Sequence, residues 1–462
     1  MSPETLLARL RELLSPAAIP DDPAPFLLDQ RRRYPSRNAV VVQPDSVDGV
    51  QTVAAFCHQH RIALTPQGGN TGLVGGSAAQ SGVVLNLSRL NRIRRINTAD
   101  NALTADAGCV LYDVQTAAAE AGRLFPLSLA SEGSCQIGGN IACNAGGLNV
   151  LRYGTMRDLV LGLEVVLPNG ELLSHLEPLH KNTSGYELKH LFVGSEGTLG
   201  IITAATLKLF APPQTVETAW VGVATAEEAV RLLAAVRNRF ADRLTSFELL
   251  SRFALDLSSA YSCLPQPADA PWHVLLELGD SLPDAALGEH LTECLTEQGF
   301  DNAVLAQSEQ QRAELWRLRE NVSAAQRDLG VSIKHDIAVP IERVADFIGA
   351  CGRDLAAAFD GIRIVVFGHL GDGSLHYNTF LPDTLDNRAY AQEDAVNRVV
   401  YRQVLAHGGT VAAEHGIGRL KAHWLPEVRS RTELELMRAV KAQLDPHGVM
   451  NPGVLFAETL SQ

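Results

Sequence analysis

FGHLGDGSLHYN, residues 367–378, is the stretch of sequence from which the rest of the chain can be interpreted. A largely apolar run precedes it, which predicts a buried strand. Asp372-Gly373 is typical of a two-residue hairpin turn, and a turn centred there places His369 opposite His376, with Asn378 on the same face. Opposed residues have Cβ atoms roughly 5 Å apart, which suits two imidazoles on one metal ion. Two core histidines in an ordinary hairpin are the alternative.

Length, charge and cysteine usage narrow the class of protein. The chain has 462 residues, too many for one hydrophobic core, so two or three domains are expected. A net charge of -13 argues against nucleic acid as a partner, because phosphate backbones bind basic surfaces. The seven cysteines never occur in CxxC spacing, which predicts reduced thiols in a cytoplasmic protein. No run approaches the ~18 apolar residues of a membrane span, so no transmembrane segment is expected.

The N-terminal part of the chain predicts a nucleotide-sized binding site. Apolar runs at 39–42 and 62–65 flank an amphipathic run at 46–60, which predicts a strand–helix–strand unit. PQGGNTGLVGGS, residues 66–77, follows directly. Its five glycines let the backbone approach a ligand closely, and its successive N–H groups can form an anion-binding nest. It fits neither the Walker loop nor the Rossmann fingerprint, because no Lys-Ser/Thr and no helix follow it.

Two further glycine-rich segments, at 138–147 and 194–200, are expected to form loops. Three such segments in one stretch predict a single long ligand lying across one domain, and a dinucleotide has a suitable size. Three unrelated loops are the alternative. After Pro212-Pro213 the pattern becomes that of an α+β domain with antiparallel strands, so a domain boundary is expected near residue 212.

A set of polar residues in the second half of the chain predicts a carboxylate site. The helix expected at 308–329 carries Arg319 and Ser323 four residues apart, on one face. Lys334 follows on the next expected strand, at 331–337. An arginine, a hydroxyl and a lysine that converge would bind a carboxylate, with the guanidinium supplying a bidentate fork. A solvated helix face is the alternative.

AAEHGIG, residues 412–418, lies at the end of an expected strand. Glu414 would complete a set of two histidines and one carboxylate with His369 and His376, which is typical of catalytic metal sites that keep positions open for substrate. His415 is then available as a general base. A surface Glu-His pair at a strand end is the alternative.

Six motifs together resemble the FAD-linked oxidoreductases of the vanillyl-alcohol oxidase type, and within them the D-2-hydroxyacid dehydrogenases. The resemblance runs from about residue 39 to residue 455, and its motifs are PQGGNTGLVGGS, GSCQIGGNIACNAGG, GSEGTLGIIT, GHLGDGSLHYN, AAEHGIG and DPHGVMNPG. The resemblance implies an α+β fold with a two-part FAD-binding domain and an α+β cap domain that has an antiparallel sheet. The FAD-binding domain would comprise residues 1–212, completed by 445–462, and the cap with its substrate and metal sites would comprise 213–444.

The resemblance also assigns residues to the cofactor. The implied FAD contacts are Pro66, Gly68, Gly69, Asn70, Thr71, Gly72, Ser77, Gly138, Gly139, Asn140, Cys143, Gly146, Gly197, Gly200, Ile202 and Asn451. Family members that link the flavin covalently through the first segment carry a histidine there. This chain has none between Pro66 and Ser77, so non-covalent FAD is expected.

The family's metal ligands correspond to His369, His376 and Glu414, with zinc as the expected ion. Its substrate-binding residues correspond to Arg319, Ser323, Lys334 and Asn378. Relatives often have threonine where this chain has Ser323; the hydroxyl is kept, but the added room leaves the identity of the substrate tail open.

The implied activity is FAD- and metal-dependent oxidation of a D-2-hydroxyacid. D-2-hydroxyglutarate, giving 2-oxoglutarate, is the best match, and D-lactate or D-malate is the alternative. His415 would be the catalytic base, and electrons would pass to an external acceptor such as electron-transferring flavoprotein or a quinone. A homodimer is one candidate assembly. The rivals are an oxidase that uses O2 directly and a metal-dependent hydrolase, which would be a colourless protein.

Overall fold

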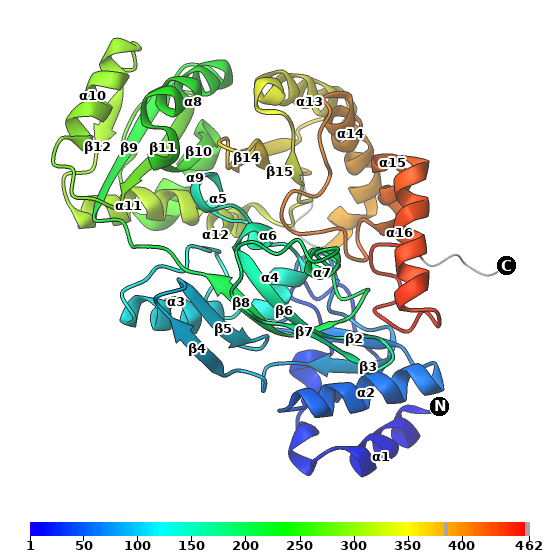
Figure 1. Ribbon diagram of the computed structural model, residues 1–462. Coiled ribbons are helices and arrows are strands. Elements are labelled where there is room, and N and C mark those ends of the chain that lie inside the picture. Colours follow the sequence, from blue (N-terminus) through cyan, green and yellow to red (C-terminus); the bar gives the residue numbers. More distant parts are fainter. Residues whose placement is uncertain (383–386, 458–462) are drawn as a thin grey trace. The chain divides into compact units, whose positions relative to one another are not determined.

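The computed structural model describes residues 1–382 and 387–457 and divides the chain into two compact units (Figure 1). Unit 1 consists of Met1–Gly147, Gly154–Ala211 and Glu414–Gln462, of which 458–462 lie outside the described residues. Unit 2 consists of Leu148–Tyr153 and Pro212–Ala413.

The chain therefore re-enters unit 1 at Glu414, earlier than the expected return at residue 445. Hydrogen bonds explain the early return. The carboxylate of Glu196 accepts from the backbone N–H groups of Ile417 (2.9 Å) and Gly418 (2.7 Å). These bonds tie the segment after Glu414 to the third glycine-rich segment of unit 1.

Unit 1 contains two sheets of different type. Three parallel strands lie in the order β1-β3-β2, and five antiparallel strands lie in the order β4-β5-β8-β6-β7. The strands are β1 (Asn38–Val42), β2 (Leu64–Gln67), β3 (Ser81–Asn86), β4 (Ile93–Asn97), β5 (Ala102–Asp106), β6 (Val160–Val166), β7 (Leu172–His175) and β8 (Ile201–Lys208). The helices are α1 (Pro3–Leu13), α2 (Val47–His60), α3 (Leu111–Glu120), α4 (Ile137–Ala142), α6 (Met156–Leu159), α7 (Lys189–Phe192), α15 (Leu425–Val428) and α16 (Arg431–Leu444).

The strand–helix–strand unit predicted near the N-terminus is confirmed, and β3 lies between its two strands. Ser46 caps α2 by accepting a hydrogen bond from the backbone N–H of Gly49, which satisfies one of the unpaired donors at the helix start. The apolar face of α2 is buried, as its periodicity predicts.

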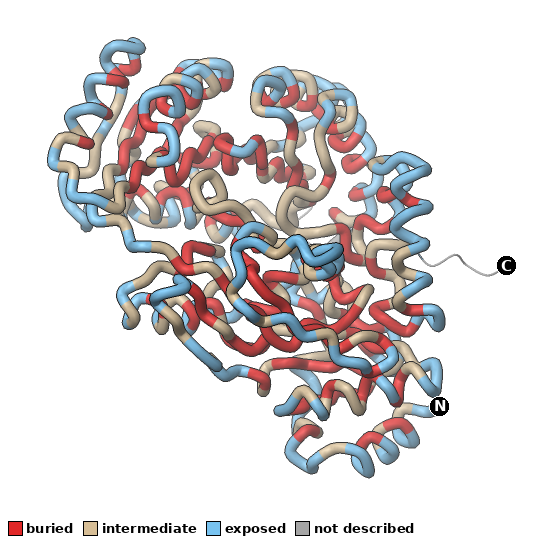
Figure 2. Tube along the Cα trace, viewed as in Figure 1, coloured by how far each residue is buried: buried red, intermediate tan, exposed pale blue. Residues whose placement is uncertain are grey.

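Unit 2 is built on one seven-stranded sheet in the order β12-β9-β11-β10-β14-β15-β13, and every pairing in it is antiparallel, as predicted. The strands are β9 (Thr215–Val223), β10 (Leu244–Ser251), β11 (Trp272–Asp280), β12 (Ala303–Leu305), β13 (Asp336–Ala338), β14 (Arg363–Gly368) and β15 (Ser374–Phe380). The helices are α5 (Val150–Tyr153), α8 (Ala226–Phe240), α9 (Arg252–Ser262), α10 (Leu287–Glu297), α11 (Glu309–Glu320), α12 (Val322–Ala325), α13 (Val344–Ala358) and α14 (Glu393–Ala406). Figure 2 shows the strands of this sheet mostly buried and the helices with exposed outer faces.

One face of the unit 2 sheet packs against α9, α11 and α12 through a single apolar cluster. Leu250 of β10 pairs with Phe367 of β14, and both belong to this cluster. Because side chains alternate along a strand, Glu248 projects from the same face as Leu250. A charged residue thus sits on the core face of the sheet, which requires a specific partner.

The hairpin between β14 and β15 differs from its prediction. His376 pairs with Phe367, not with His369, so the expected two-residue turn is wrong. The connection is a five-residue loop at 369–373, in which the N–H groups of Gly373 and Ser374 donate to Leu370 and His369. The backbone N–H of Gly371 donates to Phe247 O (3.1 Å), which ties the loop to β10. Asp-Gly therefore marks a turn here without setting its length.

Two other expected elements are shorter than predicted. The helix expected at 308–329 is interrupted at Asn321 and continues as α12 and then as a 3-10 turn. The strand expected before Glu414 is reduced to one bridge, between Thr410 and Ala338. Gly416 and Gly418 both have positive φ, so the chain turns sharply after this bridge.

His273 of β11 gives unit 2 a predicted sensitivity to acid. The side chain is fully buried, and its Nδ1 accepts from the indole N–H of Trp220 (3.2 Å). Burial, helped by the charge of Arg252, lowers its pKa to about 4. The unfolded chain, with a pKa near 6.5, then binds the proton more readily, so stability is full above pH 6.5 and falls as the pH drops toward 4.

At pH 5 this single group is expected to cost roughly 2 kcal/mol of unfolding free energy, which the substitution His273→Gln should largely remove. The measurement is the shift in unfolding midpoint between pH 7.5 and pH 5.0. The exposed His290 on α10 supplies the control, since His290→Gln should leave the shift unchanged. If His273→Gln shows the same change in unfolding midpoint between pH 7.5 and pH 5.0 as the wild type, His273 is not the source of the acid sensitivity.

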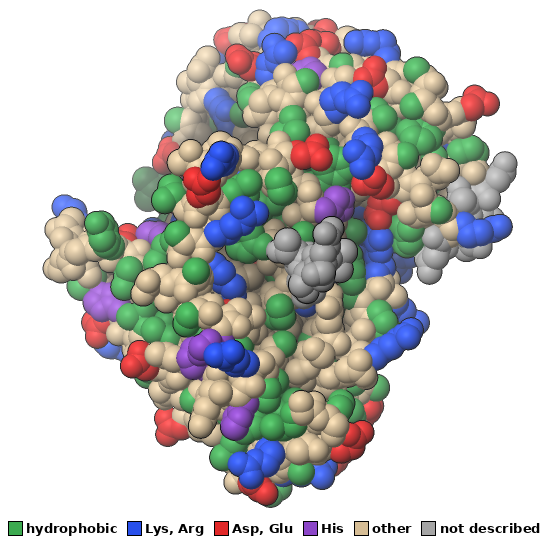
Figure 3. Space-filling view, turned by 90° about the vertical axis from the view of Figure 1, so that its right-hand side faces the viewer, with side chains coloured by type: hydrophobic (Ala, Val, Ile, Leu, Met, Phe, Trp, Pro, Cys, Tyr) green, Lys and Arg blue, Asp and Glu red, His purple; other side chains and the backbone are tan. Residues whose placement is uncertain are grey.

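Two properties of the surface and of the helices bear on possible partners. None of the helices in the described part of the chain combines the length and apolar character needed to cross a bilayer. On the face drawn in Figure 3, acidic and basic side chains lie among one another, without one large basic field.

Candidate active site

The glycine-rich segments of unit 1 converge although they are far apart in sequence. A Cβ on Gly68 would lie 3.8 Å from the backbone N of Gly139 in the second segment, and a Cβ on Gly69 would lie 2.0 Å from Ser134 O, just before that segment. The N–H of Glu196, in the third segment, donates to Ala142 O (2.8 Å). Asn451 then links the first and third segments, because its Nδ2 donates to Gly76 O and Glu196 O, both at 2.8 Å.

The second segment is helical where a loop was expected, since Gly138, Gly139 and Asn140 lie within α4. Ile137 and Ile141 are four residues apart and both fully buried, which anchors the helix despite its glycines. Gly138 has no room for a side chain, because a Cβ there would lie 2.7 Å from the Cβ of Ala107. Packing therefore overrides the low helix propensity of this segment.

The polar groups of these segments fit a cofactor that carries hydrogen-bond donors. Asn451 Oδ1 and Gln136 Oε1 are buried and have no hydrogen-bond partner within the described ranges 1–382 and 387–457. Buried polar atoms normally have partners, so these two acceptors point to a bound molecule. Asn70 and Ser77, by contrast, bond to each other: Ser77 Oγ donates to Asn70 Oδ1 (2.8 Å), and Asn70 Nδ2 donates to Leu28 O.

Two glycines of the first segment provide a matched pair of substitutions. Gly69→Ala should destabilise unit 1 by roughly 1–3 kcal/mol, because its methyl group overlaps the backbone of Ser134, just before the second segment. Gly72→Ala should leave the stability of the cofactor-free protein unchanged, since no protein atom lies within 4 Å of its Cβ position. Thermal unfolding of both cofactor-free variants measures the difference, and equal midpoints would contradict the packing.

Two histidines of unit 2 lie close together in spite of the changed hairpin register. The ring centroids of His369 and His376 are 5.9 Å apart. Two imidazoles bound to one zinc ion with Zn–N of about 2.0–2.1 Å place their centroids roughly 5 Å apart, so small adjustments suffice. Asp336 of β13 pairs directly with His376 and offers a further ligand atom within 4.8 Å of it. Imidazoles beside a carboxylate suit a divalent transition metal such as zinc.

Arg319 lies in the same unit beside His369, and a carboxylate joins them. Glu248 Oε2 accepts from Nε and Nη2 of Arg319, both at 2.7 Å, and Glu248 Oε1 lies 2.7 Å from Nδ1 of His369. Burial raises the pKa of Glu248, but the adjacent charges of Arg319 and His369 outweigh it and lower the pKa to about 2. Glu248 is therefore ionised at neutral pH, and His369 carries its proton on Nδ1.

The other residues expected to bind substrate differ in their burial and in the elements that carry them. Ser323 lies on α12 and is exposed. Lys334 is half-buried, and the register of the Ile333–Thr379 bridge and of β13 with β15 places it opposite Asn378. Asn378 is buried, and its Nδ2 donates to Gln326 Oε1 (2.9 Å). Lys334 and Asn378 therefore share one face of the sheet with His376.

Glu414 and His415 begin the last segment of unit 1. Glu414 is half-buried, and its Oε1 accepts from the backbone N–H of Gly147 at the end of the second glycine-rich segment (3.0 Å). His415 is half-buried next to it.

Sequence reasoning missed Glu248 and Asp336. Glu248 lies in an apolar strand pattern, where a single charge on the core face is the only available signal. Asp336 follows the half-buried Lys334 and begins a three-residue strand, too short for a reliable pattern. Asp336 comes close to His376 only because their strands pair. Glu248 comes close to Arg319 and His369 only in the folded chain, since they lie 71 and 121 residues away in sequence.

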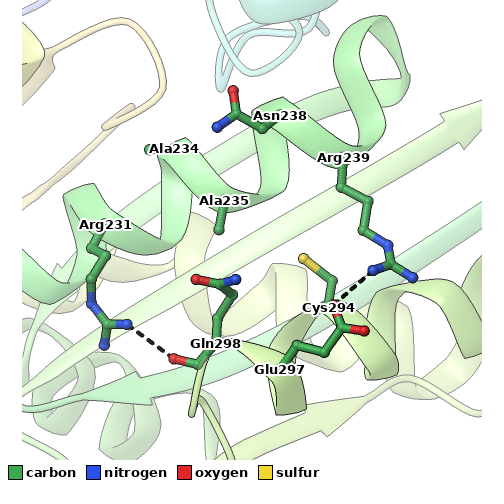
Figure 4. A pocket seen from close by; sticks show the side chains of 8 residues that line it. All are labelled: Arg231, Ala234, Ala235, Asn238, Arg239, Cys294, Glu297 and Gln298. Carbon is green, nitrogen blue, oxygen red and sulfur yellow. Dashed lines mark hydrogen bonds and ion pairs between the residues drawn. The ribbon is translucent and has the colours of Figure 1, made fainter.

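A surface pocket of about 450 Å³ lies elsewhere on unit 2, between α8 and α10 (Figure 4). Its basic groups already have partners: Arg231 donates to Gln298 O, and Arg239 pairs with Glu293 and Glu297. It contains none of the residues that the sequence singles out.

Comparisons with known proteins agree with this arrangement. Residues 38–175 match the family described as FAD binding domain, and residues 212–455 match FAD linked oxidases, C-terminal domain. A D-2-hydroxyglutarate dehydrogenase of Xanthomonas citri pv. viticola is 39% identical, covering 93% of this chain and 91% of that protein. Another D-2-hydroxyglutarate dehydrogenase, of Stutzerimonas stutzeri, is 35% identical, covering 99% of this chain and 100% of that protein. A solved structure of p-cresol methylhydroxylase with substrate bound has a TM-score of 0.78 at 16% identity, over 99% and 98% of the two chains.

These matches and the converging glycine-rich segments define a flavoprotein oxidoreductase. The chain belongs to the FAD-linked oxidase family. It is a FAD-dependent oxidoreductase that is similar to proteins named D-2-hydroxyglutarate dehydrogenase. The FAD-binding fold of the vanillyl-alcohol oxidase type, predicted from the motifs, is confirmed.

Proposed function

We propose that this protein oxidises D-2-hydroxyglutarate to 2-oxoglutarate, with FAD and a divalent metal as cofactors. The observation that carries the proposal is the cluster of unit 2 in which two imidazoles suited to a metal, those of the buried His369 and the half-buried His376, lie beside a guanidinium suited to a carboxylate. The names of the relatives and their identity of 35% or more over most of the chain support the same substrate.

Each predicted residue has a role in this proposal. His369, His376 and Glu414 hold the metal, and Asp336 lies beside His376 as a further donor. Arg319, Ser323, Lys334 and Asn378 bind and orient the substrate through its carboxylates. When bound, the metal supplies a Lewis acid that lowers the pKa of the substrate hydroxyl, and the flavin supplies the acceptor for the hydride from C2. His415 takes the hydroxyl proton as general base, since a neutral imidazole suits this task near neutral pH.

The cofactor assignment follows the converging segments of unit 1. The residues proposed to contact FAD are Pro66, Gly68, Gly69, Asn70, Thr71, Gly72, Ser77, Gly138, Gly139, Asn140, Cys143, Gly146, Gly197, Gly200, Ile202 and Asn451. The unpartnered Oδ1 of Asn451 supports a contact with a flavin donor. Attachment is non-covalent, because the first segment has no histidine.

The remaining partners follow from the chemistry. Electrons from the substrate would pass to an external acceptor such as electron-transferring flavoprotein or a quinone. The seven cysteines are all free thiols, which supports a reducing, cytoplasmic setting.

Anaerobic mixing of the purified protein with D-2-hydroxyglutarate, followed by flavin absorbance, tests the proposal. Fast bleaching that D-lactate and D-malate do not match is the expected result. If only D-lactate or only D-malate bleaches the flavin, that acid is the substrate and the mechanism is unchanged. Hydrogen peroxide formed at the turnover rate would identify an oxidase that uses O2, and a colourless protein would overturn the proposal.

A further inference from the structure

Glu248 is the buried carboxylate that connects the two kinds of binding group in unit 2. Its side chain is 1% exposed, and those of Arg319 and His369 are 6% and 9% exposed. Both carboxylate oxygens accept hydrogen bonds. Oε2 accepts from Nε and Nη2 of Arg319, and Oε1 accepts from Nδ1 of His369. The contacts are all 2.7 Å long, which is typical of charge-assisted hydrogen bonds.

The strand arrangement explains how Glu248 reaches both partners. Leu250 pairs with Phe367, so Glu248, two residues earlier on β10, projects beside the point where β14 ends and His369 begins the loop. Arg319 approaches from α11, and its guanidinium lies over the ring of Phe367, 5.0 Å from the centroid. The ring of Phe367 lies 4.9 Å from that of His376. One carboxylate and one aromatic ring therefore fix Arg319 relative to both histidines.

Stability alone is a weak reason for this arrangement. Removing an arginine and a glutamate from water is costly, and well-packed apolar residues of similar size often serve a core equally well or better. A carboxylate on Nδ1 of an imidazole, however, fixes the tautomer and leaves the lone pair on Nε2, as metal-binding histidines require. The same carboxylate fixes the plane of the guanidinium, which determines how it can meet a substrate carboxylate.

We propose that Glu248 is a positioning residue that orients His369 for metal binding and Arg319 for the substrate carboxylate. The geometry of the metal site and that of the substrate site therefore depend on the same carboxylate. This inference rests on the proposed function. It predicts that one substitution at Glu248 weakens both metal binding and substrate binding, although the residue touches neither.

Glu248→Gln is the informative substitution. An amide has one acceptor oxygen and one donor nitrogen, so it cannot accept from Arg319 and His369 together. Glu277 provides a matched control on the neighbouring strand β11: it is 8% exposed and accepts from Nε of Arg312 (2.9 Å), which also lies on α11, and from the indole of Trp316. Glu277→Gln breaks a contact between a carboxylate of the same sheet and an arginine of the same helix, α11, but it does not affect the contacts of His369 or Arg319.

The experiment measures zinc affinity, by competition with a chromophoric chelator, and KM and kcat for D-2-hydroxyglutarate, on FAD-containing protein. Glu248→Gln should weaken zinc binding by about 10–100-fold and raise KM, with FAD content unchanged. Glu277→Gln should keep wild-type zinc affinity and KM. Wild-type values in Glu248→Gln, or equal losses in both variants, would overturn the inference.

The wild-type protein separates this inference from the proposed function. If it binds zinc but D-2-hydroxyglutarate does not bleach its flavin, the proposed function fails, and the zinc comparison alone decides the role of Glu248. If the wild-type protein does not bind zinc, the positioning role for His369 is overturned.

Discussion

Replacement of His415 by alanine is expected to slow flavin reduction by D-2-hydroxyglutarate by roughly 10²–10⁴-fold, the usual contribution of a general base. The variant should keep its FAD and its metal, because the proposed ligands are other residues. Stopped-flow measurement of flavin bleaching under anaerobic conditions gives the rate directly, and absorbance and elemental analysis report the cofactors.

The exposed His447, in the same unit, is a suitable control, since His447→Ala should retain the wild-type rate. Wild-type flavin reduction in His415→Ala, with both cofactors present, would assign the proton transfer to another group. Loss of FAD or metal along with the rate would mean that His415 has a structural role.

Removal of the metal should have an effect of similar size. A Lewis acid at a reacting hydroxyl contributes several kcal/mol, so chelation is expected to slow flavin reduction by roughly 10³-fold, and added Zn²⁺ should restore it. His376→Ala should show the same slow flavin reduction without chelator, and added Zn²⁺ should not restore the rate. His290→Ala, on the exposed side of α10, should behave as the wild type.

A protein whose metal content has fallen to zero by elemental analysis, but whose flavin is still reduced at the full rate, would exclude the metal from the reaction. The histidine pair would then be structural. Restoration by Mg²⁺ but not by Zn²⁺ would contradict an imidazole-based site, because imidazole favours zinc over magnesium.

Much of the fold could be predicted because its signals are local. The helix α2 has its cap and its apolar face within fifteen residues of sequence, and the strands of unit 2 have short apolar runs bounded by turn residues. The composition of the glycine-rich segments predicts a binding site. Their convergence could be expected from the size of a dinucleotide, although the contacts between them could not.

The errors have a common physical cause, namely that tertiary contacts decide between local alternatives. Asp372-Gly373 favours a tight turn, but the bond from Gly371 to Phe247 on a neighbouring strand holds the loop open. The helicity of α4 depends on buried isoleucines and on a glycine contact with Ala107, neither of which a propensity scale contains. Glu248 was overlooked because its partners lie on a distant helix and a distant loop.

The insertion of unit 2 between two parts of unit 1 has a consequence for synthesis of the chain. Residues 1–211 carry all three glycine-rich segments, but Asn451, whose amide links the first to the third, is made only after unit 2. At about 5–20 residues per second, the ribosome needs roughly 10–50 s to travel from one to the other. During that interval the nascent N-terminal portion lacks its closing hydrogen bonds. Loading of the flavin is therefore expected to follow synthesis of Asn451, after the whole of unit 2 has been made.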